Sequence, residues 1–239
     1  MMALSLSGCK PRSPLYSQHS EALFMTDILL IRHGETAWNA IRKLQGHLDV
    51  PLNAEGTRQA KALAAELQNE KLDAIISSDL QRAVQTAGEI ARLQGISTRI
   101  DAGLRERCFG GFEGLLYSDL PLRFPEAYAV WQARDPDAPF PPGENQGETI
   151  RQFHTRVMIH ILHYAKQFEG QKIALVAHGG VLECAYRAAK NLPLDAPREV
   201  TLYNASINRF RYDPTLANGL QLISWGEIEH LNHDLTDEI

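Results

Sequence analysis

The chain of 239 residues has few cysteines, no long apolar run and no excess of positive charge, and each absence excludes a class of protein. Its three cysteines lie far apart without zinc-site spacing, so neither a disulfide framework nor a structural metal is indicated, and a reducing cytoplasm fits best. The apolar runs fall far short of the ~20 residues that span a bilayer. The net charge of −5 offers no basic field for nucleic acid or an anionic membrane. We therefore expect neither nucleic acid nor a membrane as a partner. Any site that binds an anion must be a local pocket.

The chain divides into a tail and one large folded region. Residues 1–24 contain serine and proline without hydrophobic periodicity, which predicts a disordered N-terminal extension. Met25 directly precedes the first predicted strand, so translation could start there or at Met1. Residues 25–239 are expected to form a single domain. Within it, residues 109–147 are rich in glycine, proline and aromatics, which predicts a lid-like insertion over one edge of the sheet.

Apolar strand-like runs alternate with helix-period segments from residue 27 onward. This alternation predicts a three-layer α/β fold, with a mostly parallel central sheet flanked by helices. Asn53 is a candidate helix cap, and capping-box spacing recurs at Ser78 with Gln81 and at Thr149 with Gln152. Strands are predicted at 28–31, 73–76 and 172–177, with a late hairpin or sheet edge at 206–212 and 220–228.

Polar side chains gather where these strands end. Arg32 and His33 close the first predicted strand, Arg82 lies in the first turn of a helix, and His178 closes another strand beside Gly179, whose small size lets a ligand approach the backbone. In α/β sheets the carboxyl ends of the strands form the ligand site. Two arginines and two histidines suit a phosphoryl group, because guanidinium groups match phosphate oxygens and imidazole can act as a nucleophile. No carboxylate or thiolate accompanies them, so we expect no metal site.

At this point the chain, from Met25 to about Leu231, resembles the histidine phosphatase superfamily, in its phosphoglycerate-mutase-like branch. The resemblance rests on the Arg-His-Gly signature and several further motifs. These are Leu29-Leu30-Ile31-Arg32-His33-Gly34-Glu35-Thr36, Trp38-Asn39, Gly46-His47-Leu48-Asp49-Val50-Pro51-Leu52, the segment 77–87, Leu104-Arg105-Glu106, Val176-Ala177-His178-Gly179-Gly180 and Ser224-Trp225.

The resemblance implies a role for each matching residue. His33 would attack phosphorus and become phosphohistidine, and Glu106 would be the proton donor. The resemblance also implies the groups that bind the phosphoryl oxygens: Arg32, Arg82 and His178, assisted by Asn39, with the backbone at Gly179 close by. For Glu106 the alternative is a surface ion pair with Arg105 or Arg107.

The same resemblance distinguishes a phosphatase from a mutase. In the cofactor-dependent mutases a tyrosine stands where this chain has Phe109, and a later arginine pair holds a second anionic group, whereas residues 110–147 contain only the isolated Arg123 and Arg134. The runs Phe112-Glu113-Gly114-Leu115 and Phe124-Pro125-Glu126-Ala127-Tyr128 resemble the small phosphatases, which include alpha-ribazole and broad-specificity enzymes. Residues 142–149 depart from that branch, which leaves the shape of the lid open.

We therefore expect a metal-independent phosphomonoester hydrolase that needs no cofactor and acts through a phosphohistidine on a small phosphorylated metabolite. The alternatives are a mutase dependent on 2,3-bisphosphoglycerate and a non-catalytic module that binds phosphate or a phosphoprotein. A homodimer is compatible with each of these functions.

Overall fold

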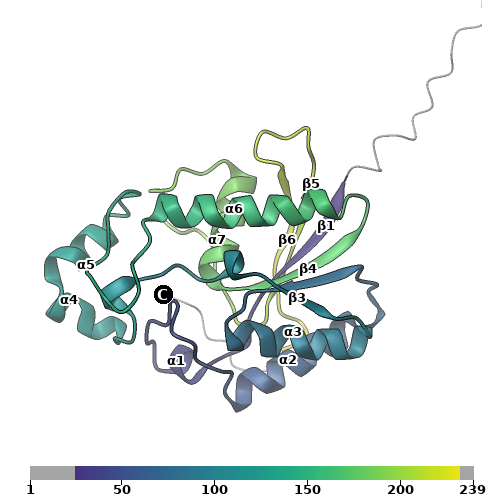
Figure 1. Ribbon diagram of the computed structural model, residues 1–239, viewed down its shortest axis with the longest axis horizontal. Helices are drawn as coiled ribbons and strands as arrows, with labels where there is room; N and C mark the ends of the chain where they lie inside the picture. Colours follow the sequence, from purple (N-terminus) through teal and green to yellow (C-terminus); the bar gives the residue numbers. More distant parts are fainter. Residues whose placement is uncertain (1–24, 232–239) are drawn as a thin grey trace, which may run out of the picture.

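The computed structural model describes residues 25–231, which are built around one six-stranded sheet (Figure 1). The strand order is β3-β2-β4-β1-β5-β6, in which the first four strands are parallel to one another, β5 is antiparallel to β1, and β6 is antiparallel to β5. The mostly parallel sheet and the antiparallel pair at its edge confirm the predicted fold class. The strands are β1 (Thr26–Arg32), β2 (Ala74–Ser77), β3 (Thr98–Ile100), β4 (Lys172–Ala177), β5 (Ile207–Tyr212) and β6 (Leu220–Glu227).

Helices cover both faces of the sheet. Helices α6 and α7 pack their apolar sides on one face, and α2 and α3 pack on the other (Figure 1). The α-helices are α1 (Ala37–Ala40), α2 (Ala54–Glu66), α3 (Gln81–Gln94), α4 (Leu120–Arg123), α5 (Pro125–Gln132), α6 (Ile150–Gln167) and α7 (Gly179–Lys190). Short 3-10 helices are η2 (Leu67–Asn69), η3 (Ala102–Leu104), η4 (Gly110–Phe112) and η5 (Tyr117–Asp119).

Two of the three predicted helix caps are confirmed. The Asn53 side chain accepts the N–H of Gly56 at the start of α2, and Thr149 forms the expected capping box with Gln152 on α6. The prediction for Ser78 was wrong: the N-cap of α3 is Leu80, which has no side-chain cap. The Ser78 hydroxyl instead accepts the Leu80 N–H at 3.4 Å and lies 2.9 Å from Nε2 of His178, which directly follows β4. Strand β3 was not predicted, because three partly exposed residues at a sheet edge show no periodicity.

The segment 109–147 has an apolar cluster of its own, apart from the two clusters beside the sheet. Phe112 is fully buried at its centre, and its ring lies 5.5 Å from that of Phe124, 5.8 Å from Trp131 and 5.2 Å from Phe140, between ring centroids. These tilted and edge-to-face contacts are the arrangement that aromatic rings prefer. The cluster supports α4 and α5, which stand to one side of the sheet (Figure 1).

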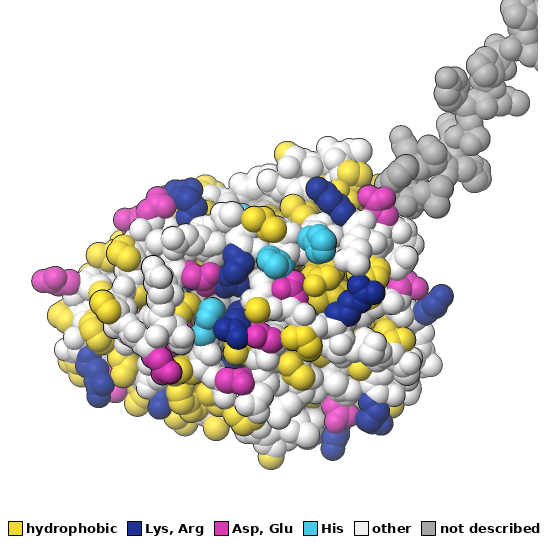
Figure 2. All heavy atoms as spheres, viewed as in Figure 1, with side chains coloured by type: hydrophobic (Ala, Val, Ile, Leu, Met, Phe, Trp, Pro, Cys, Tyr) yellow, Lys and Arg dark blue, Asp and Glu magenta, His cyan; other side chains and the backbone are white. Residues whose placement is uncertain are grey.

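The predicted N-terminal extension lies outside the described residues. Across residues 25–231, no helix has both the length and the apolar content needed to cross a membrane. Basic and acidic side chains are interspersed over the face shown in Figure 2.

Candidate active site

Two neighbouring strands bring the two predicted histidines together. Strands β1 and β4 run parallel and in register, with Arg32 opposite Ala177, so the residues that follow them meet at one edge of the sheet. The backbone N–H of His33 donates to the Ala177 carbonyl at 3.0 Å. The rings of His33 and His178 lie edge to face with centroids 5.2 Å apart, and both residues are buried. The pairing predicted from strand ends is therefore present in three dimensions.

One hydrogen bond sets the tautomer of His33. Its Nδ1 lies 2.6 Å from the carbonyl oxygen of Gly34, and a carbonyl can only accept, so Nδ1 carries the proton. Burial lowers the pKa of His33 well below its usual value, and the charges of Arg82 and Arg32 lower it further, against the raising effect of the Gly34 carbonyl. The ring is therefore neutral, with the lone pair on Nε2. This is the form in which imidazole is a nucleophile.

His178 is held in the opposite tautomer. Arg82 Nε donates to His178 Nδ1 at 3.2 Å, so Nδ1 carries no proton, and Nε2–H donates to the hydroxyl of Ser78 at 2.9 Å. Burial, followed by the charge of Arg82, lowers the pKa of His178 well below its usual value. A neutral His178 carries its one proton on Nε2, and an anion at this edge of the sheet can accept it only in place of the Ser78 hydroxyl.

Both predicted arginines are held by backbone carbonyls. Arg82 is 1% exposed, and its terminal nitrogens donate to Gly46 at 2.8 Å and to Leu48 at 3.0 Å. Arg32 is also 1% exposed and donates to the carbonyl of Leu202. These carbonyl oxygens fix the positions of the guanidinium groups and carry no full negative charge of their own.

Glu106 reaches the same edge from a loop that follows η3. Its two carboxylate oxygens each accept a backbone N–H, one from Arg107 at 2.7 Å and one from Gly180 at 2.9 Å. Gly180 is the second residue of α7, directly after the His178-Gly179 pair. Arg105 instead forms an ion pair with Asp79, and Glu106 is buried. The geometry therefore favours a role for Glu106 in the site over a surface ion pair.

Two further predicted site residues, Asn39 and Gly179, lie at the starts of two different helices. The Asn39 side chain accepts the Thr36 N–H at 3.0 Å as part of a capping box at the start of α1. Its side-chain bonds to residues in the described part of the chain run to Thr36 only. Gly179 is buried and opens α7, where backbone N–H groups lack helical partners and favour anions. The phosphate-binding role of both residues stays a prediction.

Sequence reasoning missed several groups that hold this site. The Gly34 N–H donates to the hydroxyl of Thr86 at 3.0 Å, and the Asn204 amide donates to the His33 carbonyl at 3.0 Å. Ser78 was predicted as a helix cap and holds His178 instead. The position of Ser78 directly after a buried strand was the one signal that could have placed it here.

Within residues 25–231, no three histidine, cysteine, aspartate or glutamate side chains are placed to hold a metal ion. The site offers a neutral nucleophilic imidazole, two fixed guanidinium groups, a second imidazole and a carboxyl group. This set of groups can bind a phosphoryl group and neutralise its charge with protein cations.

Comparison with known proteins agrees with this chemistry. Residues 28–227 match the model of the histidine phosphatase superfamily, branch 1. The chain is 36% identical over 214 residues to phosphoglycerate mutase-like protein 4 of Arabidopsis thaliana, covering 89% of this chain and 90% of that protein. It is also 36% identical over 217 residues to the probable phosphoglycerate mutase GpmB of Yersinia pestis, covering 90% and 99%.

A solved structure extends the likeness to the fold. Phosphoserine phosphatase of Entamoeba histolytica, in complex with 3-phosphoglyceric acid, superposes with a TM-score of 0.75 at 28% identity, over 86% of this chain and 99% of that one. The family match spans all six strands and every motif on which the resemblance was based. The chain is an enzyme and belongs to the histidine phosphatase superfamily, branch 1.

Proposed function

We propose that this protein is a metal-independent phosphomonoester hydrolase that acts on a small phosphorylated metabolite through a phosphohistidine at His33. The observation that carries the proposal is the hydrogen bond from His33 Nδ1 to the Gly34 carbonyl. It orients the imidazole and leaves the Nε2 lone pair for attack, while burial and the nearby arginines keep the ring neutral. An imidazole that served only to pair with a charged group would need neither a fixed tautomer nor a lone pair on Nε2.

In the first step, Nε2 of His33 forms a bond to phosphorus as the bond from phosphorus to the ester oxygen breaks. Arg32, Arg82 and His178 balance the charge on the three equatorial oxygens, and such oriented donors are typically worth several kcal/mol. Glu106 gives its proton to the leaving alkoxide. A bound phosphate dianion favours the protonated form of Glu106 because like charges repel.

In the second step, water attacks the phosphohistidine. Glu106, now ionised, takes a proton from the water, and the bond from phosphorus to Nε2 breaks. Inorganic phosphate leaves, and His33 returns to its neutral form. The cations in this scheme are arginines, and no three histidine, cysteine, aspartate or glutamate side chains in the described residues are placed to hold a metal ion in their stead.

The second candidate is a phosphoglycerate mutase, which the names of two relatives favour. A mutase would pass the phosphoryl group from His33 back to a second hydroxyl instead of to water. The two functions differ in one observable product. A phosphatase releases inorganic phosphate without 2,3-bisphosphoglycerate, and a mutase isomerises phosphoglycerate only with it.

The decisive experiment measures phosphate release from a panel of phosphorylated metabolites, with and without 2,3-bisphosphoglycerate, in the wild type and in His33→Ala. We expect release in the wild type without the bisphosphate, and a loss of about 10⁴-fold or more in His33→Ala. Acid-labile protein-bound phosphate should be trapped in the wild type alone. Full activity in His33→Ala, with its fold verified by circular dichroism, would exclude the mechanism.

A further inference from the structure

The peptide group between Gly34 and Glu35 connects the imidazole of His33 to a side chain on another helix. Its carbonyl oxygen accepts from Nδ1 of His33 at 2.6 Å, and its N–H donates to Oε1 of Gln59 at 2.8 Å. His33, Glu35 and Gln59 are all buried. A chain of hydrogen bonds therefore runs from the Gln59 side chain, through one peptide group, to the proposed nucleophile.

Helix α2, which carries Gln59, packs directly against this peptide group. A methyl group added at Gly34 would lie 2.5 Å from the carbonyl oxygen of Gly56, and one added at Gly56 would overlap the carbonyl of Glu35. Asn53, the N-cap of α2, donates its backbone N–H to the Glu35 carbonyl at 3.0 Å. The start of α2 thus fixes where the loop lies, and Gln59 is the side chain that fixes the orientation of the peptide plane.

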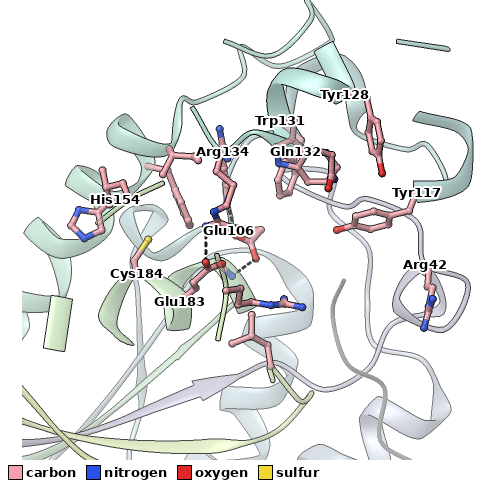
Figure 3. Close-up of a pocket in the computed structure, with 18 of the residues that line it drawn as sticks. Arg42, Glu106, Tyr117, Tyr128, Trp131, Gln132, Arg134, His154, Glu183 and Cys184 are labelled. Atoms are coloured by element: carbon pink, nitrogen blue, oxygen red, sulfur yellow. Dashed lines mark hydrogen bonds and ion pairs between the residues drawn. The ribbon is translucent and has the colours of Figure 1, made fainter. Parts of the chain in front are cut away.

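Gln59 lies away from the cavity beside the site. That cavity, of about 810 Å³, opens next to Glu106, and Gln59 is not among the residues that line it. Figure 3 shows Glu106 with Tyr117 and Tyr128 around this space. Gln59 is 1% exposed and so belongs to the protein interior. Any effect of Gln59 on the reaction must therefore pass through the peptide group to His33.

A hydrogen bond to the N–H of an amide polarises the whole amide and makes its carbonyl oxygen a better acceptor. The strengthening is roughly 10–30% per bond, and it matters most in a buried site of low dielectric. Here Gln59 strengthens the bond from Nδ1–H of His33 to the Gly34 carbonyl, which keeps the lone pair on Nε2. Without Gln59 the buried N–H would lose its acceptor, and the peptide plane would turn to find another.

We propose that Gln59 is a positioning residue for the nucleophile: it holds the Gly34–Glu35 peptide group in the orientation that keeps His33 in its reactive tautomer. The inference rests on the proposed function, because it concerns the imidazole that attacks phosphorus. The simpler explanation is that Gln59 only satisfies a buried N–H, which predicts an effect on stability alone. The two explanations differ in kcat and in the tautomer of His33.

The test replaces Gln59 by leucine, which has a similar volume and no acceptor, and by glutamate, which keeps an oxygen at the same place. In Gln59→Leu we expect kcat to fall by about 10- to 100-fold, because a small misplacement of a reacting group is costly. KM should change little, and calorimetry should give an unchanged Kd for inorganic phosphate, since the two arginines stay in place. Gln59→Glu should restore most of the lost kcat.

A spectroscopic measurement reports the tautomer directly. Long-range ¹H–¹⁵N correlation spectra distinguish a proton on Nδ1 from one on Nε2, and the His33 signal is assigned by its absence in His33→Ala. The wild type and Gln59→Glu should show the proton on Nδ1, and Gln59→Leu a mixture of both forms. If Gln59→Leu does not fold, Gln59→Asn replaces it, because the shorter side chain keeps the amide but cannot reach the Glu35 N–H.

Gln85→Leu is the matched control. Gln85 Oε1 accepts the N–H of Leu52 at 2.8 Å, which is the same kind of bond from helix α3 to a peptide group other than the one that holds His33. This variant should keep the kcat and the His33 tautomer of the wild type. An equal loss of kcat in Gln85→Leu and Gln59→Leu overturns the inference, because any such bond would then matter as much.

Three further results would overturn the inference. They are an unchanged kcat in Gln59→Leu, a loss of kcat there without any change in the tautomer of His33, and a kcat in Gln59→Glu as low as in Gln59→Leu. In the last case the acceptor oxygen at this position would not be what matters.

The tautomer measurement separates this inference from the proposed function, since it needs no turnover. If the wild type releases no phosphate from any metabolite but Gln59→Leu still shifts the tautomer of His33, the proposed function fails and the positioning role stands. If the wild type is an active phosphatase that traps acid-labile phosphate, and Gln59→Leu changes neither kcat nor the tautomer, the positioning role fails and the phosphatase stands.

Discussion

Arg156 and Glu148 form a two-pronged ion pair beside the loop that carries Glu106, with Nε to Oε1 and Nη2 to Oε2 both at 2.7 Å. The remaining donor capacity of Arg156 goes to backbone carbonyls, including that of Glu106 at 3.1 Å. Glu148 in turn accepts the N–H of Cys108 at 3.0 Å. The pair therefore holds the chain on both sides of Glu106, and we regard Arg156 as a positioning residue for the proposed proton donor.

We expect Arg156→Lys to lower kcat by about 10- to 100-fold with little change in KM, because lysine cannot reproduce the fork and a small misplacement of a catalytic group is costly. The same change in a Glu106→Gln background should cost little more, which a double-mutant cycle measures. Arg151→Lys on the same helix is the control, since its pair with Asp137 is largely exposed. If the losses of activity from Arg156→Lys and Glu106→Gln simply add in the double variant, Arg156 does not act through Glu106.

Glu106→Gln should slow the enzyme unevenly across substrates. An alkyl phosphate needs a proton on its leaving oxygen, and general acid catalysis is worth about 10²–10⁴-fold where it is needed. A phenolate departs with little protonation, so aryl phosphates should lose less than about 10-fold. The measurement is kcat/KM for a matched series of aryl and alkyl esters. Equal losses in both classes would indicate that Glu106 only holds the loop or activates water.

Stability should fall as the pH drops below about 6.5. The pKa values of His33 and His178 are lowered in the folded protein, so both stay neutral there while the unfolded chain takes up protons. The free energy of unfolding then decreases towards acid by up to about 1.4 kcal/mol per pH unit for each histidine. Urea unfolding between pH 7 and pH 5 measures this slope. His33→Ala should show a shallower slope than the wild type, and an identical slope would rule out a lowered pKa for His33.

Chelators should leave the activity unchanged. In the proposed mechanism Arg32 and Arg82 supply the positive charge that metal-dependent phosphatases obtain from metal ions, and no cluster of metal ligands was found in residues 25–231. The check is the initial rate after prolonged dialysis against EDTA, compared with the same sample given Mg²⁺, Mn²⁺ or Zn²⁺. A loss that a divalent ion restores would count against the arginine-based mechanism.

Local patterns in the sequence were sufficient to predict many of the helices and strands. Strand β4 was predicted with the observed bounds, since six consecutive residues, five of them apolar, read as a strand buried on both faces. The capping box at Thr149 was predicted because it depends on two residues three positions apart. Ser78 and Gln81 have the same spacing, yet the Ser78 hydroxyl is engaged by His178, 100 residues away. A local rule fails where a long-range partner competes for the same group.

The sequence by itself determined which chemical groups stand at strand ends, because a buried strand followed by a polar residue marks a boundary that needs no tertiary information. It therefore placed Arg32, His33 and His178 at strand ends and Arg82 in the first turn of a helix. Only the tertiary structure decided which tautomer each of these two histidines adopts, and that the Ser78 hydroxyl contacts His178. Those properties depend on contacts between segments distant in the chain, and hydrophobic periodicity reports only whether a residue is buried, not which group lies against it.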